Sequence, residues 1–294
     1  MPLPTTDGPT APLAADGPLL RGLLDDASLF PPAALPLAQA LAAHRRHRRS
    51  PYAAAVGPFL VAGSSVADLV AVLEEDDPAE PLDVVLVARP GADPAVLTAA
   101  HDALRDHPVV RVVGAELGWE DGWRDLGLDD VTLALEVPRG ERHGAALADV
   151  ADGVREGRRV LAKFRTGPTA TWAWPDEDEL AAVLVATVGA GLPLKLTGGL
   201  HHAVRGTYDV DGVAEENHGV LDVLLATAAA LSGAGADEVA CLLRLRDAAA
   251  LAELVGAWPD ATGVAVRRAL VSYGCCTVTD PLGELAVLGL TARP

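Results

Sequence analysis

Short, continuous runs of apolar residues recur along the chain, and polar segments separate them. Each run is bounded by residues such as Gly, Pro, Asp or Ser and is short for a buried helix, which is typical of a β-strand buried on both faces. Eight such strands are predicted, at residues 19–24, 53–62, 82–88, 109–113, 131–135, 159–162, 192–194 and 269–273.

Helical patterns fill most of the intervals between these runs. Helices are predicted at residues 35–49, 66–75, 94–105, 141–156 and 176–190, with a closing helix at 281–288. The interval before the last strand is longer, and it holds a polar loop at 198–217 followed by helices at 218–231, 236–246 and 248–258. Strands that alternate with helices predict an α/β fold with a parallel sheet.

Eight strand–helix repeats favour one (β/α)8 TIM barrel over residues 19–294, with a helical insertion before the last strand. Residues 1–18 are rich in Pro, Thr, Gly and Asp, which predicts a flexible N-terminal tail. The alternative is an open doubly wound sheet, but no glycine-rich turn follows the first predicted strand. In a barrel the active site lies at the C-terminal ends of the strands.

Two strand ends carry the only lysines of the chain. Lys163 follows the sixth predicted strand and Lys195 follows the seventh, whereas every other basic side chain apart from histidine is an arginine. Lysine can lose its proton at accessible pH and arginine cannot, so a chain that otherwise uses arginine indicates chemistry at these two positions.

The side-chain period of a strand predicts how these residues face one another. Glu136 at the end of the fifth strand shares a row with Lys163 and Lys195, across three neighbouring strands about 4.8 Å apart. Two close ammonium groups in a partly buried site lower each other's pKa, and the neutral amine can then attack a carbonyl carbon to form a Schiff base. The alternative is an ion-pair network that only fills the barrel.

The segments 163–167 (Lys-Phe-Arg-Thr-Gly) and 195–199 (Lys-Leu-Thr-Gly-Gly) resemble the two lysine motifs of the deoxyribose-phosphate aldolase family of class I aldolases. The resemblance implies that Lys163 forms the Schiff base and that Lys195 lowers its pKa. It also implies a fifth-strand acid at Glu136 and a first-strand aspartate within residues 25–29, which is assigned to Asp26. The phosphate-binding positions of the family correspond to Gly167, Gly198, Gly199 and the segment Gly274-Cys275-Cys276-Thr277.

The sequence departs from that family at two places. The fourth-strand aspartate of the family's proton relay has no clear match, and Glu116 is the nearest candidate. The eighth-strand serines are replaced by Cys276 and Thr277, which puts phosphate binding in doubt.

Basic residues after the sixth and seventh strands predict a positive pocket for a small anionic carbonyl substrate. With the residues named above, the predicted substrate-binding set is Arg165, Thr166, Gly167, Gly198, Gly199, His201, His202, Arg205, His218, Gly274 and Cys276. One alternative is a metal-assisted isomerase or lyase that uses His201, His202 and His218. These histidines lack a regular ligand spacing, so no metal or other cofactor is expected. A further alternative is a non-catalytic barrel that binds an anionic ligand.

The amino-acid composition of the chain argues against several classes of binding partner. A formal net charge of −18 argues against nucleic acid and anionic membranes. Three cysteines do not make a disulfide framework, and no apolar run reaches the ~18 residues of a spanning helix, so a cytoplasmic protein is expected. Whether the chain forms a homo-oligomer is left open.

Overall fold

Eight parallel strands close into a barrel in the computed structural model, which describes residues 17–75, 80–89, 91–169, 172–210 and 212–294. The predicted tail at 1–18 therefore lies almost wholly outside the described residues. Neighbouring strands pair in the closed order β1-β10-β7-β6-β5-β4-β3-β2. The strands are β1 Leu24–Asp26, β2 Val56–Ala62, β3 Leu82–Val87, β4 Val110–Gly118, β5 Thr132–Glu136, β6 Val160–Arg165, β7 Leu194–Thr197 and β10 Leu270–Cys275. The prediction of a (β/α)8 TIM barrel is confirmed.

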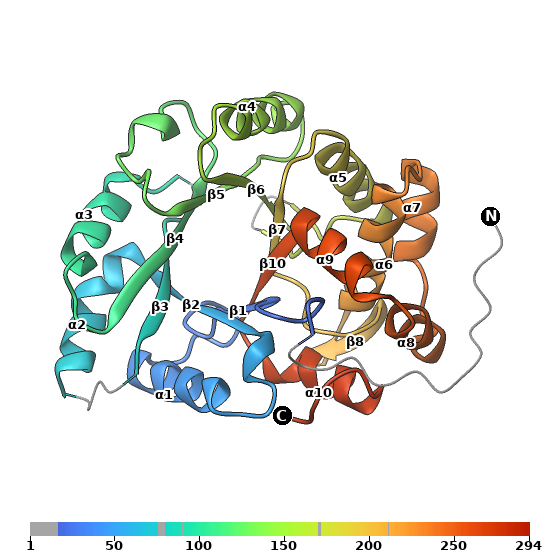
Figure 1. Cartoon of the computed structure of the whole chain (residues 1–294), viewed down its shortest axis with the longest axis horizontal. Helices are drawn as coiled ribbons and strands as arrows, with labels where there is room; N and C mark the ends of the chain where they lie inside the picture. Colours follow the sequence, from blue (N-terminus) through green and yellow to red (C-terminus); the bar gives the residue numbers. More distant parts are fainter. Residues whose placement is uncertain (1–16, 76–79, 90, 170–171, 211) are drawn as a thin grey trace.

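Helices surround the strands, and the helices of the segment between β7 and β10 group on one side (Figure 1). The barrel helices are α1 Leu37–Arg48, α2 Val66–Glu75, α3 Ala95–Leu104, α4 His143–Arg155, α5 Glu177–Gly189 and α10 Thr279–Val287. Three short 3-10 helices are η1 Ala53–Ala55, η2 Gly63–Ser65 and η3 Trp123–Asp125. Between β7 and β10 lie the strands β8 Gly206–Val210 and β9 Val213–Asn217, and the helices α6 Val220–Leu231, α7 Ala236–Leu243, α8 Ala248–Gly256 and α9 Asp260–Ala269.

The structure differs from the predicted elements at several places. Residues 53–55 form η1 ahead of β2, and β4 continues past residue 113 to Gly118. The first strand is Leu24–Asp26 rather than residues 19–24, because its two aspartates point to buried partners instead of ending the strand. Part of the predicted loop 198–217 is the antiparallel hairpin β8–β9. Helix α9, with Pro259 as its N-cap residue, was not predicted.

Apolar residues form two separate clusters. The larger cluster lies between the strands and the helices and is built mostly from Leu, Val and Ala. A smaller cluster has as its buried members Ala27, Leu60, Val85 and Val87. Leu60 pairs with Val85 across β2 and β3, and an added Cβ on Gly274 would contact both Leu60 and Ala27. This cluster therefore fills one side of the barrel interior and leaves the other side to polar residues.

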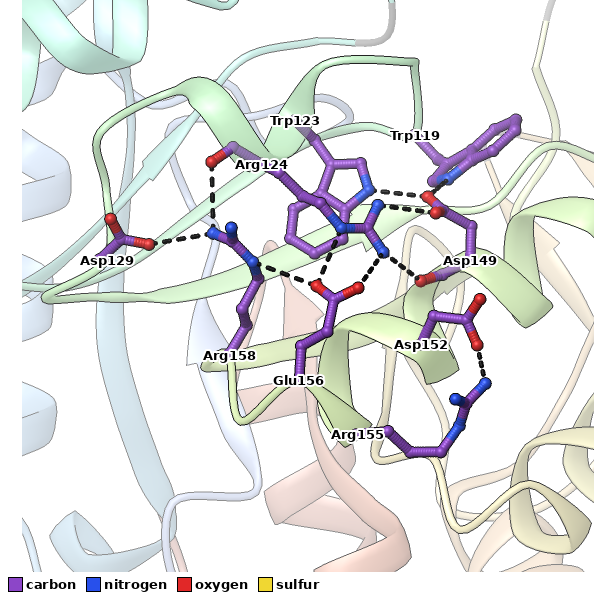
Figure 2. Close-up of polar contacts among 9 residues, drawn as sticks. All are labelled: Trp119, Trp123, Arg124, Asp129, Asp149, Asp152, Arg155, Glu156 and Arg158. Carbon is purple, nitrogen blue, oxygen red and sulfur yellow. Dashed lines mark hydrogen bonds and ion pairs between the residues drawn. The ribbon is translucent and has the colours of Figure 1, made fainter.

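The connection between β4 and β5 contains no α-helix, and a hydrogen-bonded network holds it against α4 (Figure 2). Trp119 and Trp123 each donate an indole N–H to Asp149 Oδ2 on α4, at 2.8 and 2.7 Å. Arg124 donates to Asp149 Oδ1 at 2.6 Å and lies over the ring of Trp123. A side chain on Gly153 would overlap the Trp123 ring, so the packing of η3 against α4 requires glycine there.

None of the described helices is both long and apolar enough to cross a membrane.

Candidate active site

The two lysines lie side by side on neighbouring strands, as predicted, but within β6 and β7 and buried in the barrel instead of after the strand ends. The strand register pairs Glu136 of β5 with Lys163 of β6, and Lys163 with Lys195 of β7. It then pairs Lys195 with Ser272 of β10, which extends the row to a fourth strand. Because alternate residues of a strand share a face, these side chains project together into the polar side of the interior.

Carboxylates hold both amines in an alternating chain of charges. Lys163 Nζ lies 2.8 Å from Glu116 Oε2 and 2.9 Å from Glu136 Oε2. Lys195 Nζ contacts the other oxygen of Glu116 and also Asp25 Oδ2. Glu116 therefore bridges the two lysines. The chain of contacts runs Glu136, Lys163, Glu116, Lys195, Asp25.

Further groups bind the two ends of this chain. Ser272 Oγ donates to Asp25 Oδ2 at 2.8 Å, and Arg165 Nε donates to Glu136 Oε1 at 2.9 Å. The lysines are 3% and 4% exposed, whereas the side chain of Arg165 is 31% exposed. Three carboxylates thus face two ammonium groups and one guanidinium group, and their formal charges cancel. Such balance is what allows several charges to be buried together.

The carboxylates raise the pKa values of the two lysines, whereas the sequence predicted that these pKa values are lowered. Burial lowers the pKa of Lys163, but the negative charges of Glu116 and Glu136 outweigh it and leave this pKa above its usual value. The pKa of Lys195 is likewise raised, because Asp25 and Glu116 outweigh its burial. Burial raises the pKa of Glu116, but the two lysines overcome this effect and hold it at about 2. The expectation of lysine pKa values near neutrality is therefore wrong for the substrate-free protein.

Asp25, and not Asp26, is the first-strand acid next to the lysines. Asp26 faces the opposite side of β1, where its Oδ2 lies 3.0 Å from Nδ1 of His44 on α1. Its Oδ1 accepts a hydrogen bond from the backbone N–H of Ser28 at 3.0 Å. The catalytic assignment of Asp26 is corrected for this reason. Successive residues of a strand point to opposite faces, so the two aspartates cannot share a role.

Several residues of the predicted positive pocket bind protein groups instead of lining an open site. Arg205 is 9% exposed, and its Nε donates to Glu177 Oε1 at 2.7 Å. His202 stacks on Tyr208, and its Nδ1 lies 2.7 Å from Glu284 Oε1. These contacts join the segment after β7 to α5 and α10. The predicted positive pocket is therefore not supported at Arg205 or His202, because an acidic side chain already binds each of them.

The histidines do not converge on one point. His218 is buried, and its Nε2 lies 2.8 Å from the carbonyl oxygen of Pro175, whereas His201 contacts Cys276. Among the residues that the structure describes, no group of three or more His, Cys, Asp or Glu side chains is arranged to hold a metal ion.

The glycines after the two lysines bring two loops into close contact. A Cβ on Gly167 would overlap the carbonyl oxygen of Gly198, and one on Gly199 would press on the backbone of Thr166. Thr166 is itself buried, and its backbone N–H donates to the Thr197 carbonyl at 2.8 Å. Close backbone packing explains these glycines, and their predicted role in substrate binding stays a prediction.

Glu116 is the residue that sequence reasoning left without a firm role, although it joins both lysines. Its signal was its position on the fourth strand, where Gly114 and Gly118 lie two residues to either side on the same face. Small neighbours leave space for a long acidic side chain to reach across the interior.

Comparisons with known proteins add little to this description. No protein-family model matches the chain, and no curated protein matches it in sequence. One solved structure that matches is Yersinia pestis DHPS with a pterine-sulfa conjugate, at 11% sequence identity and a TM-score of 0.42, covering 92% of this chain and 94% of that chain. The fold assignment rests on the strand order and register. These define a (β/α)8 barrel with a buried lysine–carboxylate centre.

Proposed function

We propose that this barrel is a Schiff-base-forming lyase that acts on a small carbonyl compound, with Lys163 as the nucleophile. The observation that carries the proposal is the chain of contacts Lys163–Glu116–Lys195–Asp25 inside the barrel. It supplies an amine, a carboxylate within 2.8 Å that can take up its proton, and a second cation that holds this carboxylate in place.

Lys163 is the better nucleophile of the pair because its surroundings are the more open. Its partner Glu136 has a side chain that is 9% exposed, and Glu136 in turn binds the partly exposed Arg165. The carboxylates next to Lys195 have side chains that are only 5% and 2% exposed. The resemblance of segments 163–167 and 195–199 to class I aldolases supports the same assignment.

The protons of the first step can be followed through Glu116. Lys163 transfers a proton to Glu116, and its neutral nitrogen attacks the carbonyl carbon to give a carbinolamine. Glu116 then passes a proton from solvent to the carbinolamine hydroxyl, which leaves as water and completes the iminium ion. Lys195 stays protonated between Asp25 and Glu116 and stabilises the carboxylate when it is charged.

The surroundings favour a small substrate with an anionic substituent. Arg165 is the one cation of this charge chain with a partly exposed side chain, and Glu136 neutralises it only in part because Lys163 shares that carboxylate. The apolar side of the barrel, at Leu60 and Val85, can pack against a short carbon chain. A non-catalytic anion-binding barrel is less well supported, because the acids already neutralise the buried amines.

Borohydride trapping tests the proposal. The protein is incubated with short aldehydes and ketones, with and without a phosphate or carboxylate group, then reduced and analysed by intact mass and peptide mapping. We expect one adduct, on the peptide that holds Lys163, and none in Lys163→Arg. Because the chain has only two lysines, Lys195→Arg is a matched control that retains the adduct. An adduct confined to Lys195, or none with any compound, contradicts the proposal.

A further inference from the structure

A cysteine and a histidine meet at the C-terminal end of the barrel, apart from the lysine centre. Along β10, Ser272 and Gly274 face the interior, and Cys276 follows them at the next position of the same period. Gly274 lies between Ser272 and Cys276 on this face and pairs with Thr197 of β7. Because glycine has no side chain, no side chain of β10 stands between Ser272 and Cys276.

The contacts of Cys276 are those of a thiol poised to ionise. Its Sγ lies 3.7 Å from Nδ1 of His201, in the loop after β7, and 3.8 Å from Oγ1 of Thr277. An imidazolium next to the sulfur stabilises the thiolate over the thiol.

Charges from the neighbouring elements support the same state. Hydrogen bonding to Cys276 raises the pKa of His201, and Asp280 on α10 raises it further, while burial and His202 oppose both. Burial raises the pKa of Cys276, but His201 outweighs it and leaves the pKa below its usual value. The pair therefore favours a thiolate next to an imidazolium.

The other two cysteines provide internal references. Cys275 points to the opposite face of β10, lies in the main apolar core, and has its pKa raised by burial. Cys241 is exposed on α7. Cys276 differs from both because it is paired with a histidine and keeps 7% of its surface exposed.

We propose that Cys276 and His201 form a second nucleophilic site at the C-terminal end of the barrel, which adds reversibly to small aldehydes. The thiolate sulfur attacks the carbonyl carbon and forms a C–S bond, and the electron pair of the C=O π bond moves to oxygen. The imidazolium of His201 donates its Nδ1 proton to that oxygen. The products are a hemithioacetal and a neutral imidazole, and the reverse reaction restores both groups.

An addition to an aldehyde needs only the two groups that this site supplies, a thiolate that attacks the carbonyl carbon and an imidazolium that protonates its oxygen. The imidazolium contacts the sulfur, so it also lies beside an oxygen on the carbon that the sulfur binds. The small exposed surface of Cys276 restricts the site to small molecules. The reaction does not involve Lys163, so the proposal stands apart from the lyase function.

Alkylation by iodoacetamide measures the thiolate at each cysteine. Rates at Cys276 and Cys241 are followed by peptide mass in one sample from about pH 6 to about pH 9. We expect the midpoint of the Cys276 profile to lie below that of Cys241. In His201→Gln the Cys276 midpoint rises by at least about one pH unit, with Cys241 unchanged. Labelling of Cys275 reports any unfolding.

A second arm tests the aldehyde, in the Lys163→Arg variant so that a Schiff base at that lysine plays no part. Acetaldehyde should slow alkylation of Cys276 several-fold, reversibly on dialysis, and leave Cys241 unaffected. The proposal is overturned if the Cys276 midpoint equals or exceeds that of Cys241, or if Cys276 does not react in the folded protein. It is also overturned if acetaldehyde leaves the Cys276 rate unchanged.

Discussion

Glu116 on β4 lies 2.8 Å from Lys163 on β6, so this ion pair spans the barrel interior past the intervening strand β5. The second oxygen of the same carboxylate contacts Lys195 on β7. One acid thereby contacts both lysines, while Glu136 adds a second negative charge beside Lys163 and Asp25 adds one beside Lys195. The negative charge of Glu116 helps to keep both amines protonated in the substrate-free protein. Glu116 is also the group that accepts a proton from Lys163 before Lys163 can attack.

The first prediction concerns pH. Because the carboxylates raise the pKa of Lys163 above its usual value, the neutral amine is a minor form at pH 7. Glu116, with its pKa held at about 2, passes the Lys163 proton on to water, so the fraction of neutral amine should rise about tenfold per pH unit through the neutral range and continue to rise past about pH 9, and with it the rate of borohydride-trapped adduct formation. Lys163→Arg supplies the background rate at each pH. A plateau near pH 7 would contradict the raised pKa.

The second prediction separates the two lysines. Lys195→Arg keeps a cation between Asp25 and Glu116 and should retain measurable adduct formation, whereas Lys163→Arg removes it. Lys195→Leu removes that cation, so the pKa of Lys163 should rise further and the pH profile should shift upward.

Removing one buried partner costs about 3–5 kcal/mol, so Lys195→Leu is also combined with Asp25→Asn, which removes one acid with the cation. Circular dichroism and urea titration check the fold of each variant. Equal loss of adduct in all the lysine variants, with no shift in the pH profile, would show no asymmetry between the two positions.

The third prediction concerns the network around Asp149. Asp149→Ala removes the acceptor of two indole N–H groups and one of the acceptors of Arg124, and it should lower the free energy of unfolding by about 1–3 kcal/mol. Asp152→Ala is the matched control on the same helix, because among the described residues the Asp152 side chain forms an ion pair with Arg155 alone, on the surface of α4 (Figure 2). Its effect should stay below about 0.5 kcal/mol. Urea unfolding of both variants that gives equal losses would assign no special role to the network.

The fourth prediction uses Asp222, which is fully buried at the start of α6. Burial raises its pKa from 3.8 to about 7. The folded state therefore holds a proton that the unfolded state has lost, so the free energy of unfolding should fall as pH rises between about 4 and 7. A shift of about three pKa units changes the free energy of unfolding by at most about 4 kcal/mol over this pH range.

Asp222→Asn should remove this dependence, because the amide has no charge and its oxygen can still accept from the Arg205 backbone N–H. Relative to the parent protein, the variant should therefore gain stability between pH 5 and pH 8 in urea titrations. Asp237→Asn, at an exposed position of α7, should track the parent at both pH values. Parallel curves for the parent and Asp222→Asn would contradict the prediction.

The sequence alone determined the barrel and the row of Glu136, Lys163 and Lys195. These features depend on the period of two along each strand and on the alternation of strands with helices, which are local properties of the chain. The same reasoning misplaced the first strand, because Asp25 and Asp26 look like the polar end of a strand until their buried partners are known. The same reasoning also predicted a loop where the hairpin β8–β9 lies. Tyr208 of this hairpin packs on His202, and a local sequence pattern does not show such a tertiary contact.

Only the tertiary structure decided the state of the lysines. From the sequence, two adjacent amines lower each other's pKa, and nothing in the spacing shows that Glu116 and Asp25 lie between or beside them. Barrel closure brings Asp25 to Lys195 across 170 positions of sequence, and it aims Glu116 at both amines. The sign of a pKa shift depends on every charge within a few ångströms, whichever part of the chain supplies it. A local pattern can therefore place the lysines in one row but cannot set their charge.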